Sequence, residues 1–352
     1  MRQRFTRAGL FAAAAAAAGL MATGVCAQSS DGYFKGKTVR LVVGAGAGGV
    51  YGAIGRVTTR HMPKYLPGEP TMVLEHMTGA GGIRISNWLY NVAPSDGSVI
   101  GMQLPDATAI QAHSPWRIKY DARKFNWLSS WGEATHVLSV QKDCTTVRTL
   151  QEAKKTEAVL GGFSPNSANY QYPVLVNHLL GTKFKMVAGY RGGGAIRNAI
   201  DKCEVAGWAG FYLGWVTGRP QWIEQDKLTH LVQFALHPGD HPIVRNVPLL
   251  INMTDNPDDK AVFRFVSLSG FIARALTTPP ATPADVNEAI DSAFSRMLRD
   301  PAFLADAARV KLPIKPFTAQ QVRERVAEVL STPKAVTDRY VDIVGLKRPG
   351  KK

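Results

Sequence analysis

The stretch RLVVGAGAGGVYG, residues Arg40–Gly52, joins an apolar segment to a cluster of glycines. Residues 38–43 fit a buried strand, and we expect a helix over about residues 51–61. Glycine at a helix start lets a ligand approach the backbone N–H groups closely, and the helix dipole favours an anion there. The stretch therefore predicts a strand, an anion-binding loop and a helix in succession.

The same loop matches the dinucleotide-binding fingerprint G-x-G-x-x-G, here Gly44-x-Gly46-x-x-Gly49. Glu75 stands near the end of the next expected strand, where an acidic residue would bind the ribose hydroxyls of NAD. An exported NAD-dependent oxidoreductase that uses this loop is therefore one open alternative.

Glycine-rich helix starts recur twice more along the chain. Residues 79–82 follow an expected strand and open a second helix, and residues 192–194 do the same further on. Three such starts exceed what one dinucleotide site requires, whereas a small ligand with more than one anionic group would use several. The recurrence favours a small polyanionic ligand.

The N-terminus has the parts of an export signal. Arg2, Arg4 and Arg7 precede an uncharged, alanine-rich apolar run, and small residues end that run at Ala27. We expect a cleavable Sec-type signal peptide over residues 1–27 and a periplasmic mature protein; a membrane anchor is the alternative. Secreted proteins rarely meet free NAD, which counts against the dinucleotide hypothesis.

The charge of the chain suits an acidic ligand. The 352 residues carry a formal net charge of +15, and loss of the three signal arginines leaves +12. Lysine and arginine are scattered, and no motif of stacking aromatics accompanies them, so we predict no nucleic-acid partner.

Residues for catalysis or metal binding are poorly represented in the sequence. The eight histidines lie apart, and the pair His237 and His241 sits in a proline-containing loop. No G-x-S-x-G elbow, catalytic-cysteine signature or H-E-x-x-H motif is present. We predict a protein that is not an enzyme and that holds neither a metal ion nor a cofactor.

Two cysteines, Cys144 and Cys203, remain after removal of the signal. An oxidising compartment permits a disulfide between them, but the sequence does not supply the geometry that a disulfide requires. A bridge and two separate buried thiols both stay open.

Short apolar strands alternate with helical segments, which is typical of an α/β fold with largely parallel sheets. Capping-type spacing marks three helix starts, at Thr149 with Glu152, Thr282 with Asp285, and Thr318 with Gln321. The C-terminal part is expected to be mostly helical. Two α/β lobes connected by strands fit this pattern better than two separate domains.

Five stretches carry a resemblance to a known family and occur in the family's order: YFKGKTVRLVVGAGAGGVYG, EHMTGAGGIRISNWLYNVAPSDGSVIGM, GYRGGGAIRNAI, FIARALTTPPATPADV and DPAFLADAARVKLPI. Together they span nearly the whole mature chain. On these stretches the chain resembles the extracytoplasmic solute receptors of tripartite tricarboxylate transporters, the Bug-type periplasmic binding proteins.

The resemblance implies a two-lobe, type II-like periplasmic binding fold, each lobe a sheet flanked by helices, with a ligand cleft between them. Lobe 1 would comprise residues 28–131 and 235–352, and lobe 2 residues 132–234. The implied function is capture of a small carboxylated organic acid for the membrane subunits of a tripartite tricarboxylate-type transporter, by a monomer. A ligand-sensing receptor for a signalling partner is a further alternative.

The resemblance also implies ligand-binding residues, because loops of both lobes grip carboxylates through backbone N–H groups in the family. By position the candidates are Ala47, Gly48, Gly49, Tyr51, Gly81, Gly82 and Gln103 in lobe 1, and Ser164, Asn166, Ser167, Tyr190, Arg191, Gly192 and Gly193 in lobe 2. The three polar residues at 164–167 fit ordinary helix N-caps equally well. Arg191 would supply positive charge.

Two positions depart from the family pattern. Gly52 stands where an aspartate is common, and Ala47 stands where a proline is usual. Absence of that carboxylate removes an acceptor for a ligand hydroxyl or amine and favours anions. We therefore expect a mono- or dicarboxylate as ligand and not an amino acid.

Overall fold

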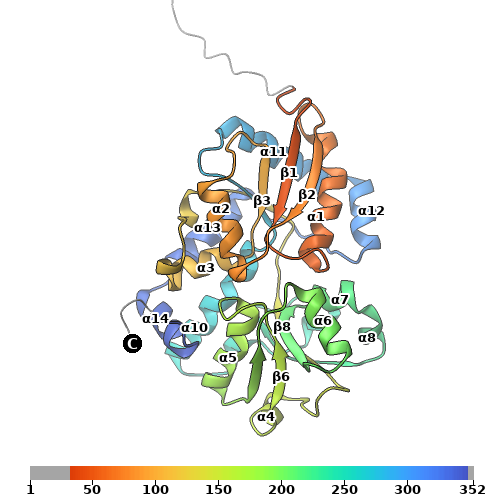
Figure 1. The fold of residues 1–352 in the computed structure, drawn as a ribbon. Helices are drawn as coiled ribbons and strands as arrows, with labels where there is room; N and C mark the ends of the chain where they lie inside the picture. Colours follow the sequence, from red (N-terminus) through yellow and green to blue (C-terminus); the bar gives the residue numbers. More distant parts are fainter. Residues whose placement is uncertain (1–31, 348–352) are drawn as a thin grey trace, which may run out of the picture.

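The computed structural model describes residues 32–347, and the expected signal peptide lies outside them. Two five-stranded sheets form two lobes, one above the other in Figure 1. The strands are β1 (Thr38–Val43), β2 (Thr71–His76), β3 (Val99–Met102), β4 (Asn126–Ser130), β5 (His136–Gln141), β6 (Ala158–Gly161), β7 (Phe184–Val187), β8 (Gly207–Phe211), β9 (Leu228–Phe234) and β10 (Ala275–Thr278). This two-lobe α/β architecture confirms the predicted fold class.

The two sheets share one topology. The first has the order β2-β1-β3-β10-β4, and the second has the order β7-β6-β8-β5-β9. In the first, β1 pairs in parallel with β2 and β3, whereas β10 is antiparallel to both of its neighbours. In the second, β6 pairs in parallel with β7 and β8, and β5 is antiparallel to both neighbours. In each sheet the fourth strand in this order, β10 or β5, is the first strand after the chain crosses from the other lobe.

Helices cover the sheets. They are α1 (Val50–His61), α2 (Ile83–Asn91), α3 (Asp106–His113), α4 (Leu150–Ala153), α5 (Ala168–Leu180), α6 (Gly193–Asp201), α7 (Leu213–Gly218), α8 (Pro220–Glu224), α9 (Pro242–Arg245), α10 (Pro257–Leu268), α11 (Ala284–Met297), α12 (Pro301–Arg309), α13 (Ala319–Leu330) and α14 (Lys334–Ile343). No helix within residues 32–347 is long and apolar enough to cross a membrane.

Apolar faces of these helices bury the sheets. In α11, buried Val286, Ile290, Ala293, Phe294 and Met297 recur at helical spacing and join a core that also contains the apolar side chains of α1 and α12. The opposite face of the first sheet carries α2, α3 and α13, and their core continues into the second lobe through α5, α10 and α14 (Figure 1). All six residues of β5 are buried, as expected for a strand covered on both faces.

Two of the three expected helix caps are confirmed. Thr149 with Glu152, and Thr318 with Gln321, each form a reciprocal capping box at the start of α4 and α13. The expectation for Thr282 is wrong, because α11 begins at Ala284 with Pro283 as N-cap and without a side-chain cap bond. The ring of Pro283 restricts the backbone at the helix start, where the Thr282 hydroxyl was expected to form the cap.

The chain passes from the first sheet to the second between Ser130 and His136. It leaves the second sheet at Phe234 and re-enters the first at Ala275. In the segment between these two points, α10 packs against the C-terminal helix α14. Helix α14 in turn contacts α3 of the first lobe and α5 of the second. The expected lobe limits at residues 131 and 235 therefore stay a prediction, since helices after residue 235 pack on both lobes.

A disulfide joins Cys144 and Cys203, with the two Cα atoms 5.1 Å apart. It ties the loop after β5 to the turn after α6, across 59 residues of sequence. Of the two alternatives left open by the sequence, the bridge is therefore the one present. A cross-link over a loop of this length restricts the unfolded chain strongly.

We expect the Cys144→Ala, Cys203→Ala double variant to lose about 2–4 kcal/mol of unfolding free energy, because its unfolded state is no longer cross-linked. Urea unfolding followed by circular dichroism measures the loss. Wild-type protein under reducing conditions is the control and should unfold like the variant. Equal stability of the oxidised protein and the variant would contradict the prediction.

Candidate ligand-binding cleft

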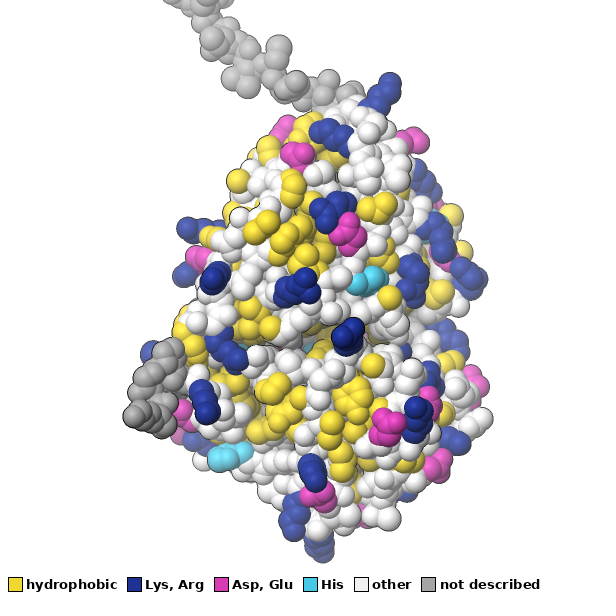
Figure 2. All heavy atoms as spheres, in the orientation of Figure 1, with side chains coloured by type: hydrophobic (Ala, Val, Ile, Leu, Met, Phe, Trp, Pro, Cys, Tyr) yellow, Lys and Arg dark blue, Asp and Glu magenta, His cyan; other side chains and the backbone are white. Residues whose placement is uncertain are grey.

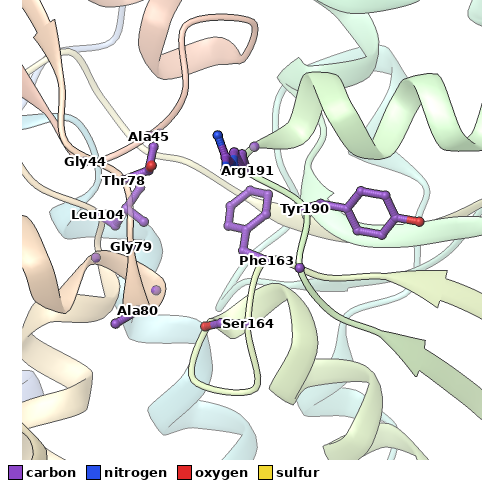
Figure 3. A pocket seen from close by; sticks show the side chains of 14 residues that line it. Gly44, Ala45, Thr78, Gly79, Ala80, Leu104, Phe163, Ser164, Tyr190 and Arg191 are labelled. Atoms are coloured by element: carbon purple, nitrogen blue, oxygen red, sulfur yellow. The ribbon is translucent and has the colours of Figure 1, made fainter.

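A cavity of about 240 Å³ lies between the lobes, where strand ends of both sheets meet. In Figure 3, side chains of the first lobe face those of the second across it. Its wall is formed by the loops after β1, β2, β3, β6 and β7, through Gly44, Ala45, Thr78, Gly79, Ala80, Gly81, Gly82, Leu104, Phe163, Ser164, Gly189, Tyr190, Arg191 and Gly192. Loops at the carboxyl ends of parallel strands are the usual binding position in α/β sheets.

Three helices start beside this cavity without side-chain caps. The N-caps of α1, α2 and α6 are Gly49, Gly82 and Gly192, and no side-chain cap bond is formed at any of them. Gly82 has φ 98°, a left-handed conformation that favours glycine. The backbone donors of these first turns therefore lack the carboxamide or hydroxyl acceptors that usually satisfy them, and an anion can serve instead.

The chemistry of the wall suits an anion with an apolar middle. Of the lining residues in the described chain, none is Asp or Glu, and Arg191 carries the positive charge. Thr78 and Ser164 contribute hydroxyls from opposite lobes, and Leu104 and Phe163 contribute apolar surface between them (Figure 3). The molecular face in Figure 2 shows Lys and Arg spread over both lobes and interleaved with acidic residues.

The glycine loops of the two lobes touch through their backbones. A methyl group on Gly46 would lie 2.8 Å from the Arg191 carbonyl oxygen, and one on Gly194 would lie 2.9 Å from the Gly48 carbonyl oxygen. Both distances are shorter than any Cβ–oxygen contact that packing tolerates. We call this arrangement, with the two loops in contact, the closed form, and it requires glycine at Gly46 and Gly194.

Arg197, which the sequence analysis did not single out, holds this contact from the second lobe. It lies on α6 with 4% of its surface exposed, and its Nη2 donates to the Gly48 carbonyl over 3.0 Å. Its Nε and Nη1 find no partner within residues 32–347. Burial, with a further contribution from nearby Arg219, lowers the pKa of Arg197 to about 10. The side chain remains a cation and bridges the lobes beside the cavity.

Six of the residues expected from the resemblance line the cavity: Gly81, Gly82, Ser164, Tyr190, Arg191 and Gly192. The ring of Tyr190 extends away from Thr78 and Leu104, so that residue contributes mainly backbone to the wall (Figure 3). Ser164 Oγ accepts from the Asn166 N–H over 3.3 Å, which leaves its proton to donate. These six remain candidates for direct ligand contact.

The other expected residues lie elsewhere. Gly48, Gly49 and Gly193 belong to the contact between the glycine loops, beside the cavity, whereas the Ala47 carbonyl accepts from Arg56 Nη1 within its own lobe. The backbone of Asn166 approaches Gly81, and Ser167 is buried with its hydroxyl donating to the Ser164 carbonyl over 2.7 Å.

Two expected residues, Tyr51 and Gln103, are core residues in this closed form. The hydroxyl of Tyr51 accepts from the Arg274 N–H over 3.3 Å, and burial raises the pKa of Tyr51 strongly. Gln103 is 2% exposed, and both of its amide atoms lack a partner in the described chain.

The residues that the sequence analysis missed carry weak chemical signals. Thr78 and Gly79 belong to the recognised glycine loop, and their neighbours could have suggested them. Leu104 and Phe163 are ordinary apolar residues that follow strands, so only the fold identifies them.

Gly52 has a steric role. A methyl group there would lie 2.2 Å from the Ala47 carbonyl oxygen, and Arg56 Nη1 donates to that oxygen over 3.0 Å. Aspartate at this position would therefore require the loop to move. Glycine at position 52 therefore permits the loop to fold back, so that the Ala47 carbonyl lies close to the start of α1.

The dinucleotide hypothesis loses its acidic residue. Glu75 accepts from Arg40 Nε and Nη2, both over 2.6 Å, across the β1–β2 pair. The fingerprint loop is packed against Arg191 and Gly194 of the other lobe. Neither the carboxylate nor the glycine backbone is free for a dinucleotide, so the structure does not support that alternative.

Asp106 is a buried carboxylate at the junction of the lobes. It starts α3 in the first lobe, and its Oδ2 accepts from the Ala168 N–H of α5 over 3.2 Å. Burial raises the pKa of Asp106 to about 6, although the hydrogen bond opposes the shift. Ionisation of Asp106 therefore costs stability in the closed form.

Comparison with known proteins shows which of them this chain resembles. No family model matches the chain. A UPF0065 protein from the gbd 5' region of Cupriavidus necator is 25% identical over 350 residues, covering 96% of this chain and 97% of that protein. The periplasmic binding protein BugD superposes with a TM-score of 0.68 at 16% identity, over 89% of this chain and 99% of BugD.

Two ligand-bound structures from Rhodopseudomonas palustris are similar as well. MatC with bound malate has a TM-score of 0.65 at 21% identity, over 88% of this chain and 100% of MatC. Rpa4515 with adipate has a TM-score of 0.66 at 15% identity, over 88% of this chain and 98% of Rpa4515. The chain has the two-lobe fold of periplasmic binding proteins. Its structural neighbours are of the Bug and TctC type, which confirms the resemblance at the level of the fold.

We expect Gly194→Ala to hinder closure, because its methyl group would meet the Gly48 carbonyl at 2.9 Å. Gly48→Ala is the matched control, since its nearest neighbour would be the Gly194 Cα at 3.9 Å, an ordinary contact. Small-angle X-ray scattering should give a larger radius of gyration for Gly194→Ala and an unchanged one for Gly48→Ala. Identical radii for all three proteins would refute the prediction.

We expect Asp106→Asn to stabilise the protein at neutral pH. Burial raises the pKa of Asp106 from its ordinary value of 3.8 to about 6 in the folded state. The stability that the protonated carboxyl contributes is therefore fully present below about pH 4 and is lost as the pH rises through 6. The variant should gain up to about 3 kcal/mol over wild type at pH 7.5 and nothing at pH 4. Urea unfolding at both values measures this, and a pH-independent difference contradicts it.

Proposed function

We propose that this protein is a periplasmic solute-binding receptor that captures a small carboxylated organic acid by closure of its lobes. The observation that carries the proposal is the cavity between two glycine loops, which has uncapped helix starts and Arg191 in its wall and no lining carboxylate in the described chain. Structural neighbours with adipate and with malate support the ligand class.

We place the two ends of the ligand on opposite lobes. One carboxylate would accept from backbone N–H groups of residues 79–81, and the other from the start of α6 beside Arg191. Leu104 and Phe163 would contact the carbon chain between them. Hydrogen bonds to a charged acceptor are worth about 1.5–3 kcal/mol each, so a few of them suffice for closure.

The receptor would hand its ligand to the membrane subunits of a tripartite tricarboxylate-type transporter, as a monomer released into the periplasm by cleavage after Ala27. Its neighbours of the Bug and TctC type are described as periplasmic or solute-binding proteins, and this supports the location and the transport role. In this proposal the protein performs no chemistry on the ligand.

Calorimetric titration of ligand-free protein with malate, adipate and a panel of further di- and tricarboxylates tests the proposal. We expect at least one dicarboxylate to bind, and Arg191→Gln to weaken that binding roughly tenfold, about 1.4 kcal/mol. Arg325→Gln is the control, because Arg325 pairs with Glu328 on the surface of α13.

Native mass spectrometry first establishes that the protein is ligand-free. Absence of binding across the whole panel would then defeat the carboxylate proposal. A Kd of the Arg191→Gln variant equal to that of wild type would remove Arg191 from the site but leave the glycine loops in it.

A further inference from the structure

The guanidinium of Arg197 lies in a slot beside three glycines. A methyl group on Gly218 would lie 2.4 Å from Arg197 Nε, and one on Gly214 would lie 3.2 Å from Nη1. A methyl group on Gly193 would lie 3.3 Å from the same Nη1. Gly193 belongs to α6, and the other two glycines belong to α7. The absence of side chains at these positions therefore makes the room that the guanidinium occupies.

The slot directs Arg197 toward the first lobe. Both α6 and α7 connect strands of the second sheet, and α7 also contacts α1 of the first lobe. Across this junction Arg197 Nη2 donates to the Gly48 carbonyl over 3.0 Å. Because glycines of its own lobe hold the planar guanidinium in place, Arg197 loses little side-chain freedom when the lobes meet.

The acidic residue nearest in effect to Arg197 is already occupied. Asp201 attracts the positive charge of Arg197, but its carboxylate accepts from Arg219, with Nε at 3.1 Å. The acceptor that the described chain offers to Arg197 is therefore the Gly48 carbonyl of the other lobe. Hydrogen bonds with an ionised donor are stronger than those between neutral groups, so this contact favours the closed form.

We propose that Arg197 is a positioning residue that latches the two lobes in the closed form and thereby slows release of the ligand. The effect on release rests on the proposed function, because only a cleft that holds a ligand can release one. The helix that carries Arg197 starts at Gly192 in the cavity wall. Arg197 touches no ligand itself and acts by holding the start of α6 against the loop of residues 46–49.

Closure can be measured without any ligand, by double electron–electron resonance between spin labels on the two lobes. Thr71→Cys and Lys185→Cys place labels at exposed positions of the edge strands β2 and β7. These edges lie opposite the strands through which the chain crosses between the lobes, so opening lengthens the label distance. We expect Arg197→Ala to raise the ratio of long to short distances about tenfold.

Gly218→Ala tests the slot while it retains Arg197 and its charge. Its methyl group would displace the guanidinium, because the end of a long side chain yields more easily than the helix does. We expect the same shift in the distance ratio as for Arg197→Ala, and no further shift when the two substitutions are combined. Arg219→Gln is the charge control, since Arg219 donates to Asp201 and Asn198 within the second lobe, and it should leave the ratio unchanged.

Stopped-flow tryptophan fluorescence with malate and adipate measures ligand retention. We expect koff to rise about tenfold in Arg197→Ala and in Gly218→Ala, and kon to change less than twofold, because the latch forms after the ligand has entered. Urea unfolding confirms that each variant is folded.

The two measurements separate the latch from the proposed function. If no carboxylate binds to wild type, the proposed function fails, but the label distances still decide on the latch. Equal distance ratios in wild type, Arg197→Ala and Gly218→Ala would overturn the latch. An effect of Gly218→Ala that persists undiminished in the Arg197→Ala background would overturn it as well.

Discussion

Backbone contact between the two glycine loops is the constraint on which the cleft depends. Gly46 of the first lobe meets the backbone of Arg191, and the Gly48 carbonyl meets Gly194 of the second lobe, at distances that leave no room for a side chain at Gly46 or Gly194. Because the backbones come this close, the uncapped starts of α2 and α6 face one small cavity from two sides. The glycines therefore matter first for how the lobes meet and only then for what they bind.

Closure buries polar groups that the protein satisfies incompletely. Arg197 has two nitrogens without hydrogen-bond partners in the described chain, and Gln103 has no partner there for either of its amide atoms. Burial raises the pKa of Asp106 to about 6. Arg197 and Asp106, whose hydrogen-bond partners lie in the other lobe, would regain water if the lobes separated. A ligand that bridges the lobes offsets this cost, which couples occupancy of the cleft to its closure.

Much of the fold could be predicted from the sequence, because strands followed by glycine-rich loops leave a strong local signal. The short strands β4 and β10 carry little local signal, since each is defined by its neighbours in the sheet and not by its own pattern. Cys144 and Cys203 could be proposed as a pair but not decided, because a disulfide depends on how two distant loops pack.

The cleft was predictable where glycine marks the backbone. It was not predictable where a side chain acts across the lobes. Arg197 has the sequence context of a solvated helix surface, and only the position of Gly48 in the other lobe reveals its contact. Tyr51 is the opposite case. Its position beside the loop suggested the cleft, but its hydroxyl turns toward Arg274 in the core.

The strand order has a consequence for the sequence in which the two lobes can fold. β10 stands between β3 and β4 in the first sheet, yet it follows β9, the last strand of the second sheet, in the sequence. The first lobe thus cannot complete its sheet until the chain has been synthesised beyond the second lobe. The second sheet is formed by one continuous segment, residues 136–234, and its disulfide lies within it, so it can assemble earlier. The lobe encoded in the middle of the chain provides the surface against which both ends of the chain fold.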